Sequence, residues 1–354
     1  MTNSIQDTVI SLLPGKRKTS PNNWVSFNAP CCSHNGESKD TRGRGGLMFT
    51  PEGGVSYHCF NCQFKTGWQP GRHVSYKFRK LLKWFGAEEN EVKRLVIEAL
   101  RIKDTVSPDI AEKTKEDYAV KPRPLPSESI SISELVTFLI MNNENAQESD
   151  YAQLIKSVEY LHNRKIDMQK YEFYITPETF SNMHKRVIIP FYWKGQLIGY
   201  TGRAIDDSVK PKYYNSYENS VVFNMDNQKK HNKFVLVMEG PFDAMAVDGV
   251  ATCGDDISEA KADLIESLGK EVIVVPDFDL KEVRGKKVWT GERLVDLAIE
   301  YGWSVSFPIW KDTCKDVSKA VELYGKLFTL KSILDAKESS RLKIELLKRR
   351  IHTS

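Results

Sequence analysis

The sequence 271-EVIVVPDFD-279 decides the fold of the carboxy-terminal half of the chain, and an earlier segment, 234-FVLVME-239, has the same form. Each is an apolar run that ends in acidic residues, which is typical of a strand buried on both faces. A further strand is predicted at VSFPIW, residues 305–310. Helical spacing begins at Phe242 and recurs near 259–268 and 288–301. Strands that alternate with helices indicate an α/β domain with a mostly parallel sheet.

Acidic side chains stand where the predicted strands end. Open α/β sheets place their ligand sites at the carboxyl ends of strands, and carboxylate oxygens are ligands that Mg²⁺ prefers. The candidates for a magnesium site are Glu239, Asp243, Asp277, Asp279, Asp312 and Asp316. A set of solvated loop carboxylates and helix caps is the structural alternative, and it applies most readily to Asp312 or Asp316 alone. Glu239 together with the Asp277/Asp279 pair favours the metal site.

Metal-ligand residues near the amino end form two pairs, each with two residues between its members. The predicted zinc ligands are Cys31, His34, Cys59 and Cys62. Two such pairs can close a tetrahedron around Zn²⁺, and a fully occupied tetrahedral zinc site is structural. Cys32 and His58 stand beside these ligands and could replace them in another register, but the first pair as chosen repeats the spacing of the second. Buried thiols with a surface histidine are the alternative without metal.

Basic and aromatic residues surround the predicted zinc site. Basic side chains can engage phosphates, and exposed aromatic faces can stack on unpaired bases. The basic residues are Lys39, Arg42, Arg44 and Lys65, and the aromatic residues are Tyr57, Phe60, Phe64 and Trp68. The alternative is that the aromatic residues fill the core of a module too small to bury much apolar surface. Metal binding would then supply much of its folding free energy.

Composition indicates a globular protein of two or three domains. The chain has 354 residues, 40% hydrophobic and 28% charged, with a formal net charge of +4. No apolar run approaches the roughly 20 residues that cross a bilayer, so no membrane partner is expected. The start, MTNSIQDTVISLLPGKRK, has its basic cluster after the apolar stretch, the reverse of a secretory signal. The six cysteines then favour metal binding or burial in a reducing compartment, and we expect a cytoplasmic protein.

Five segments are expected along the chain, which gives a mixed fold class of α+β and α/β domains. The boundaries are a zinc-ribbon-like β module with flanking helices at 1–102, a linker at 103–128, a basic α+β subdomain at 129–232, the mostly parallel α/β domain at 233–328 and a basic helix at 329–354. The linker is marked by scattered charges and the sequence PRPLP.

The cysteine segments resemble a known family. CCSHNGESKD (31–40) with YHCFNCQFKTG (57–67) is similar to the Cys-His-Cys-Cys zinc-binding domain of DnaG-type DNA primases, including those of phages. The family often has proline after its first cysteine, where this chain has Cys32. The resemblance implies that Zn²⁺ is held by the four predicted ligands. Of the basic residues beside them, Arg42 and Arg44 are expected to bind the template.

The acidic segments resemble the Toprim domain of primases, topoisomerases and some nucleases. Its signature is a glutamate that ends the first strand and an Asp-x-Asp after a later one, here Glu239, Asp277 and Asp279. The resemblance implies that both aspartates bind Mg²⁺ or Mn²⁺ and that Glu239 is a metal ligand or general acid/base. The family often runs from Asp-x-Asp straight into a helix, whereas LKEVRGKKVWTG (280–291) intervenes here and brings four basic residues near the site: Lys281, Arg284, Lys286 and Lys287.

The segment that separates primases from other Toprim proteins lies at 186–225. RVIIPFYWKGQLIGYTGRAI (186–205), followed by KPKYYNS and VVFN, resembles the RNA-polymerase subdomain that precedes Toprim in DnaG-type primases. The resemblance implies that the nucleotide or template is bound by Arg203, Lys212, Tyr213 and Asn215. A basic wall would then face the acidic pocket, whereas a generic β-hairpin with a surface arginine is the structural alternative.

The expected function is that of a DnaG-type primase of the phage kind, a nucleotidyltransferase that makes RNA primers from ribonucleoside triphosphates on single-stranded DNA. The chain has no G-x-x-x-x-G-K-[ST] phosphate loop, so a separate replicative helicase is the expected partner in the primosome. A basic carboxy-terminal helix carrying Lys343, Lys348, Arg349 and Arg350 is a candidate dock for it. The alternatives are a Toprim nuclease and a non-catalytic zinc/Toprim scaffold in replication or recombination.

Overall fold

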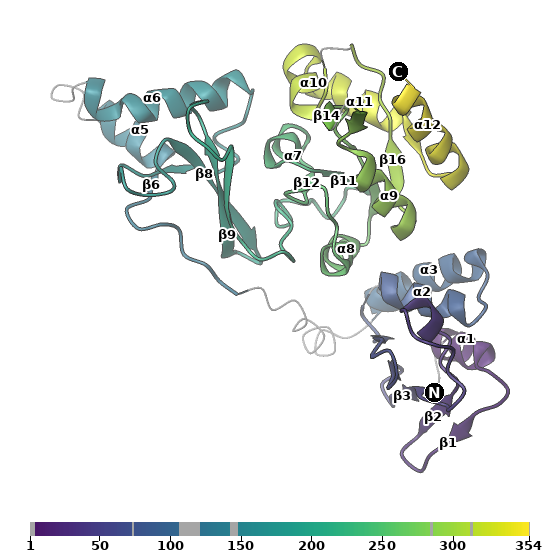
Figure 1. Cartoon of the computed structure of the whole chain (residues 1–354). Coiled ribbons are helices and arrows are strands. Elements are labelled where there is room, and N and C mark those ends of the chain that lie inside the picture. Colours follow the sequence, from purple (N-terminus) through teal and green to yellow (C-terminus); the bar gives the residue numbers. More distant parts are fainter. Residues whose placement is uncertain are drawn as a thin grey trace. The chain divides into compact units, whose positions relative to one another are not determined.

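The computed structural model describes residues 4–72, 74–105, 121–141, 148–283, 286–311 and 314–353. It divides into two units, Met1–Ala119 with Ala262–Gly269, and Val120–Lys261 with Lys270–Ser354 (Figure 1). The boundary between the units falls within the segment expected to be a linker, of which 106–120 lie outside the described residues. No helix in the described ranges is long and apolar enough to span a membrane.

An antiparallel sheet of five strands in sequence order, β1 to β5, forms the centre of the first unit. The elements are α1 (Ser4–Leu12), β1 (Lys18–Thr19), β2 (Trp24–Phe27), the 3-10 helix η1 (Cys32–His34), β3 (Gly45–Phe49), β4 (Val55–Cys59), β5 (Lys65–Trp68), α2 (Tyr76–Trp84) and α3 (Glu89–Thr105). Strands β2 and β4 alternate between buried and half-buried residues, so one sheet face packs on the core and the other remains accessible. Tyr57 and Trp68, at 1% and 2% exposure, belong to that core.

A second antiparallel sheet begins the second unit, in the order β10-β9-β8-β7-β6. Its elements are β6 (Ile130–Ser131), α5 (Ile132–Met141), α6 (Glu148–Asn163), β7 (Tyr174–Ile175), β8 (Arg186–Trp193), β9 (Gln196–Ala204) and β10 (Tyr213–Ser216). The turn between β8 and β9 is Lys194-Gly195, and both residues have positive φ, of 51° and 73°. Such a two-residue turn matches the twist of a hairpin.

A mostly parallel sheet follows in the same unit, in the order β12-β11-β13-β16-β17, with only the edge strand β17 antiparallel. The elements are β11 (Phe234–Met238), α7 (Pro241–Val247), β12 (Val250–Ala251), β13 (Glu271–Val274), β14 (Leu280–Val283), β15 (Lys286–Trp289), α9 (Glu292–Tyr301), β16 (Ser304–Ser306), α10 (Val317–Tyr324), α11 (Lys326–Asp335), β17 (Lys337–Glu338) and α12 (Arg341–Thr353). Helix α8 (Glu259–Glu266) lies between β12 and β13 in the chain, and from Ala262 on it is assigned to the first unit. Strands β11, β13 and β16 are almost wholly buried, as strands covered on both faces must be.

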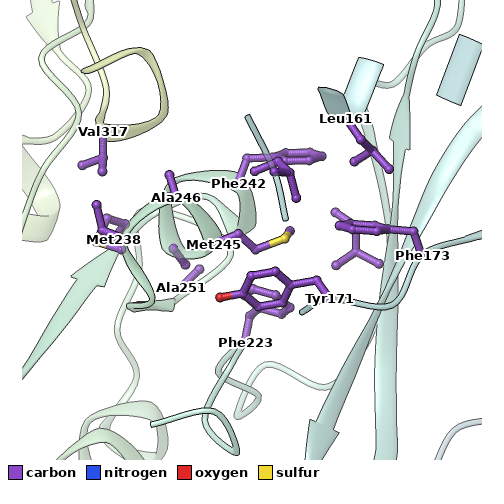
Figure 2. Close-up of a cluster of buried hydrophobic side chains, with 14 of the residues drawn as sticks. Leu161, Tyr171, Phe173, Phe223, Met238, Phe242, Met245, Ala246, Ala251 and Val317 are labelled. Atoms are coloured by element: carbon purple, nitrogen blue, oxygen red, sulfur yellow. The ribbon is translucent and has the colours of Figure 1, made fainter. Parts of the chain in front are cut away.

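One hydrophobic core joins the two sheets of the second unit. Phe242 and Met245 of α7 lie among Tyr171, Phe173 and Phe223 from the antiparallel part, as Figure 2 shows. The shared core places the end of β9 and the start of α7 within one rigid packing arrangement. Side chains from both sheets can therefore line one site.

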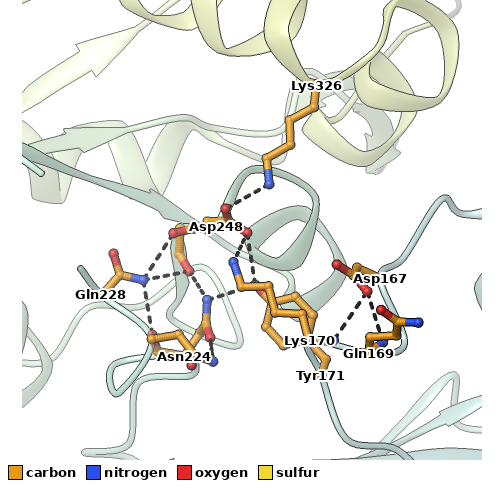
Figure 3. A network of polar contacts seen from close by, with 10 residues as sticks. Asp167, Gln169, Lys170, Tyr171, Asn224, Gln228, Asp248 and Lys326 are labelled. Carbon is orange, nitrogen blue, oxygen red and sulfur yellow. Dashed lines mark hydrogen bonds and ion pairs between the residues drawn. The ribbon is translucent and has the colours of Figure 1, made fainter.

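A polar network reinforces this junction at the carboxyl end of α7 (Figure 3). Asp248, in the left-handed conformation with φ 58°, accepts from Lys170 Nζ at 2.5 Å and from Lys326 Nζ at 2.8 Å. Burial would raise the pKa of Asp248, but hydrogen bonds from these two lysines hold it below its usual value. The carboxylate thus links the antiparallel part, α7 and α11.

Two segments differ from their predicted structures. The prediction of a single basic helix at 329–354 is wrong, because α11 ends at Asp335 and α12 begins at Arg341, with β17 between them. The interruption arises because Glu338 pairs with Val305 of β16 and its carboxylate accepts from Ser340 N at 2.8 Å. The insertion at 280–291 holds the hairpin β14–β15, which is a small sheet of its own.

Candidate functional site

Four thiols come together in the first unit. Cys31 and Cys32 lie at the start of η1, Cys59 ends β4 and Cys62 follows in the next turn. Their Sγ atoms all lie within 4.8 Å of one another, with Cys31–Cys62 at 3.3 Å and Cys32–Cys59 at 3.5 Å. Zn–S bonds of about 2.3 Å place tetrahedral sulfur ligands slightly further apart than these pairs, so a small adjustment would admit Zn²⁺.

Cys32, and not His34, is the fourth member of this cluster, which differs from the predicted ligand set. The 3-10 turn of η1 directs Cys32 into the core, where it is fully buried, and leaves His34 exposed. The His34 ring stacks instead on Trp84 of α2, with ring centroids 4.8 Å apart and an interplanar angle of 5°. The two adjacent cysteines allowed both registers, and the turn geometry favours the one with four sulfurs.

A hydrogen-bond donor reaches each of the four sulfurs. Asn61 contacts two of them, with its Nδ2 3.4 Å from Cys32 Sγ and its backbone N 3.4 Å from Cys59 Sγ. Tyr57 Oη lies 3.2 Å from Cys31 Sγ, and Asn35 Nδ2 lies 3.6 Å from Cys62 Sγ. Burial raises the pKa of Cys32 to about 11, so the free thiol stays protonated until a cation replaces its proton. This donor set fits a thiolate-bound cation, and neither asparagine was among the predicted site residues.

The residues predicted to contact template lie around this sheet. Arg44 Nε pairs with Asp40 at 3.3 Å, and the Arg42 backbone N–H donates to the same carboxylate at 2.9 Å. Phe60, 58% exposed, packs edge-on against Trp24 with centroids 5.9 Å apart. Phe60 and Trp24 therefore offer aromatic surface at the accessible face of the sheet, whereas Tyr57 and Trp68 do not.

A cavity of about 300 Å³ in the second unit collects most of the other predicted residues. Its acidic side is lined by Glu239, Asp243, Asp277 and Asp316, and its other side by Arg164, Arg203, Lys212, Tyr213 and Asn215. Glu239 directly follows β11, Asp243 is in the first turn of α7, and Asp316 is the N-cap of α10. The carboxyl ends of the parallel strands thus meet the hairpin formed by β9 and β10, on which Arg203 and Tyr213 are cross-strand partners.

Three carboxyl groups of this cavity have raised pKa values, so their protonated forms are favoured. Burial, and then Asp255 and Asp243, raise the pKa of Glu239 to about 7. Burial, and then Glu239 and Asp316, raise the pKa of Asp277 to about 7, and burial also raises that of Asp243. Glu239 Oε1 is buried and has no hydrogen-bond partner among the described residues. Crowded, buried oxygen ligands of this kind fit a hard divalent cation, which would offset their charge.

Two of the six predicted carboxylates do not belong to this lining. Asp279 is 39% exposed and pairs with Lys315 Nζ at 2.7 Å. Asp312 lies outside the described residues. Among the described side chains, only the four thiols form a metal-ligand group with all ligand atoms within 4.8 Å, so the carboxylates stand further apart than the sulfurs. Water ligands would have to complete the shell of a magnesium ion held here.

The basic side of the cavity is held by aromatic rings. Arg203, only 8% exposed, lies over Tyr213 at 4.8 Å and Tyr160 at 5.8 Å, and its Nε has no hydrogen-bond partner among the described residues. Arg164 lies over Tyr160 at 4.9 Å and Phe242 at 5.0 Å. Burial, followed by Arg203 and Arg164, lowers the pKa of Lys212. A cationic wall on one side of the cavity suits a phosphate-bearing ligand.

Arg164 and Tyr160 were not among the predicted site residues. They are four positions apart, Tyr160 in the last turn of α6 and Arg164 in the turn directly after its end, and the Arg164 guanidinium lies over the Tyr160 ring. The spacing was visible in YLHNRK (160–165), but only the packing of α6 beside β9 relates it to Arg203. The insertion adds Lys281, which lines a second cavity of about 620 Å³ together with Glu239 and Asp255. Arg284 lies outside the described residues.

Comparison with known proteins locates the antiparallel part of the second unit in a family. Residues 152–231 match the family model for the DNA primase catalytic core, N-terminal domain. The DNA primase of Clostridium acetobutylicum is 30% identical over 115 residues, 28% of this chain and 19% of that protein. The DNA primase of Aquifex aeolicus is 27% identical over 158 residues, 40% of this chain and 30% of that protein. Part of the chain is thus similar to the catalytic core of DnaG-type primases, and the matches span less than a third of either relative.

Solved structures of DNA primases are also similar. A DnaG primase catalytic domain bound to single-stranded DNA matches with 19% identity and a TM-score of 0.44, over 62% of this chain and 83% of that chain. The zinc-binding and RNA polymerase domains of the Aquifex aeolicus primase match with 17% identity and a TM-score of 0.38, over 99% and 88%.

Proposed function

We propose that this chain is a DNA primase, which joins ribonucleotides into short RNA primers on a single-stranded DNA template during DNA replication. The observation that carries the proposal is the shared cavity, in which buried and half-buried carboxylates face cationic side chains, of which Arg203 is buried. Arg164, Arg203 and Lys212 of the cationic wall lie within the segment that matches the primase core. A nucleoside triphosphate with its divalent cation is complementary to both walls.

The reaction would form a bond between the 3′-oxygen of the primer strand and the α-phosphorus of a ribonucleoside triphosphate. The electron pair of the broken P–O bond leaves with pyrophosphate. Glu239 and Asp277 would hold Mg²⁺ or Mn²⁺, which when bound offsets charge on the phosphate oxygens. Arg203 would grip those oxygens with its guanidinium fork, and Lys212 would add a point charge. Glu239 is placed either to hold the cation or to accept the proton of the attacking hydroxyl.

The remaining predicted residues would have supporting roles in this cavity. Asn215 accepts from Thr201 Oγ1 at 2.6 Å, which orients its amide beside the basic wall. Tyr213 supports Arg203 through its ring. Asp279 would reach the cation only after it leaves Lys315, and we propose Asp243 and Asp316 as carboxylates that complete the negative side of the pocket. Positioning and charge neutralisation carry most of the catalysis in phosphoryl-type transfers.

The thiol module would bind structural Zn²⁺ and contact the template. Phe60 and Trp24 would provide stacking surface for bases. Arg42, Arg44 and Lys65 stand beside the thiol module in the sequence and would engage phosphates. We propose a phage-type primase in the cytoplasm that works beside a separate replicative helicase. The carboxy-terminal helix is a weaker candidate for the helicase dock than its basic sequence suggested, since Lys348 pairs with Asp296 at 2.6 Å and Glu292 at 3.5 Å of α9.

Incubation with single-stranded DNA, Mg²⁺ and labelled ribonucleotides tests the proposal. A primase yields short RNA products, and their synthesis requires every ribonucleotide that is complementary to the template. Nicked DNA would instead identify a Toprim nuclease, and a gel shift without products would identify a scaffold. Either of these two results contradicts the proposed function.

A further inference from the structure

The hairpin β14–β15 returns the chain onto the loop that carries Asp277 and Asp279. Trp289, the last residue of β15, is 1% exposed, and its ring stacks on Phe278 with centroids 6.2 Å apart and an interplanar angle of 15°. Its indole Nε1–H donates to the backbone oxygen of Asp277 at 2.6 Å. A buried tryptophan is thus bonded to the residue whose carboxylate lines the cavity.

Thr290 makes the corresponding contact with the second aspartate. Its backbone N–H and its Oγ1–H both donate to the backbone oxygen of Asp279, each at 3.0 Å. Gly291 follows so closely that a Cβ at this position would lie 2.5 Å from the Asp277 backbone oxygen. Residues 289–291 therefore pack against the backbone of both aspartates.

The hydrogen bonds from Trp289 and Thr290 hold the loop beyond the last hydrogen bond that it makes to the parallel sheet. Strand β13 ends at Val274, and the backbone N–H of Val275 still donates to Val237 at 2.9 Å. Pro276 has no N–H to donate, and the next backbone donor with a partner is Phe278, which bonds to Lys315 at 2.7 Å. The carbonyl groups of Asp277 and Asp279 are bonded by Trp289 and Thr290, and the backbone orientation they set determines where each carboxylate points.

We propose that Trp289 and Thr290 are positioning residues that hold the Asp277–Asp279 loop for a divalent cation. Toprim proteins often continue from Asp-x-Asp directly into a helix, whereas this chain has the insertion at 280–291. In this proposal the end of the insertion stabilises the loop that would bind the cation. The inference rests on the proposed function in so far as that function makes this loop a cation site. It concerns hydrogen bonds to backbone oxygens, so it needs no contact between either side chain and the cation or nucleotide.

Titration of the full chain with Mn²⁺, followed by electron paramagnetic resonance of the free ion, tests the inference without an activity assay. D277N defines the signal that belongs to this site. Thr290→Val keeps the side-chain shape and removes one donor, Trp289→Phe keeps an aromatic ring and removes the other, and Thr290→Ser keeps the hydroxyl. Loss of an outer-shell hydrogen bond typically weakens metal binding at least tenfold. We expect about tenfold weaker Mn²⁺ binding in T290V and W289F, and recovery to within about twofold of wild type in T290S.

The rest of the hairpin provides the matched control. Replacing residues 282–287 by an Asn-Gly turn shortens the hairpin and leaves Trp289 and Thr290 in place, so Mn²⁺ affinity should stay within about twofold of wild type. T290V and W289F that bind Mn²⁺ like the wild type would overturn the inference, and so would T290S as weak as T290V. Should W289F lose its fold by circular dichroism, the T290V/T290S pair still decides. Equal Mn²⁺ binding by D277N and wild type would instead show that Asp277 is not part of a cation site, which would also contradict the proposed function.

Discussion

The thiol cluster and the carboxylate cavity differ in how completely each is assembled. The four sulfurs lie within 4.8 Å of one another and each has a hydrogen-bond donor. The carboxylates surround an open cavity, and Glu239 Oε1 has no hydrogen-bond partner among the described residues. Thiols can pack closely while protonated and neutral, whereas buried carboxylates that approach as closely would repel or take up protons. The first arrangement suits a metal that holds a fold, and the second suits a metal that arrives with its substrate.

The largest effect should come from removing one thiol. Cys59→Ser should abolish zinc binding and remove most of the folding free energy of the first unit, since structural zinc contributes on the order of 10 kcal/mol in small modules. Zinc content by atomic absorption and amide hydrogen exchange over residues 4–105 measure the loss. Cys314→Ala, which removes a buried thiol of the second unit, is the control and should keep its zinc. Retention of zinc and of amide protection in C59S would show that the cluster is not a metal site.

The identity of the fourth ligand sharpens the same comparison. Cys32→Ala should lose zinc or bind it far more weakly, because Cys32 Sγ lies inside the cluster. His34→Ala should retain about one zinc per chain, because its ring stacks on Trp84. The opposite outcome, zinc lost in H34A and kept in C32A, would restore the Cys-His-Cys-Cys set that the sequence resemblance implied.

The carboxylate cavity should make the stability of the second unit depend on pH. The folded-state pKa values of Glu239 and Asp277 are raised from 4.5 and 3.8 to about 7, so the folded state binds more protons than the unfolded state between these limits. Stability from this source is complete below about pH 4 and is lost as pH rises through 7. Between pH 5 and 8, without added Mg²⁺, the wild type should therefore lose more thermal stability than D277N, and Mg²⁺ should reverse part of the loss. Parallel pH profiles of the two proteins would contradict this.

A smaller effect on stability is expected from the polar network around Asp248, at the carboxyl end of α7. Asp248→Asn keeps a residue that tolerates the left-handed conformation and removes the charge shared by Lys170 and Lys326. We expect the second unit to lose about 1–2 kcal/mol of unfolding free energy by chemical denaturation, with zinc content unchanged. Lys331→Ala, at an exposed ion pair with Asp335, should cost less than D248N. An equal cost for both would mean that the network adds nothing to the junction.

The carboxylates of the cavity could be predicted from the sequence because their position follows a local rule. Glu239 and Asp277 come directly after apolar runs, and strand ends meet at one edge of a parallel sheet whatever the rest of the chain does. The spacing favoured His34 over Cys32, because Cys31-x2-His34 repeats Cys59-x2-Cys62, and spacing does not reveal the 3-10 turn that buries Cys32. Arg164 was missed because it follows the end of α6 and joins Arg203 only through tertiary packing. Asp279 shares a motif with Asp277, yet its partner Lys315 comes from a distant segment.

Primer synthesis by D277N tests the central claim most directly, because it separates the two regions in one protein. With single-stranded DNA, Mg²⁺ and labelled ribonucleotides, we expect wild type to make short RNA and D277N to lose at least about a thousandfold in rate, while its zinc content and first-unit amide protection stay unchanged. The exposed control D207N should retain wild-type activity. Short RNA products from D277N at the wild-type rate would contradict the assignment of the chemistry to the carboxylate cavity.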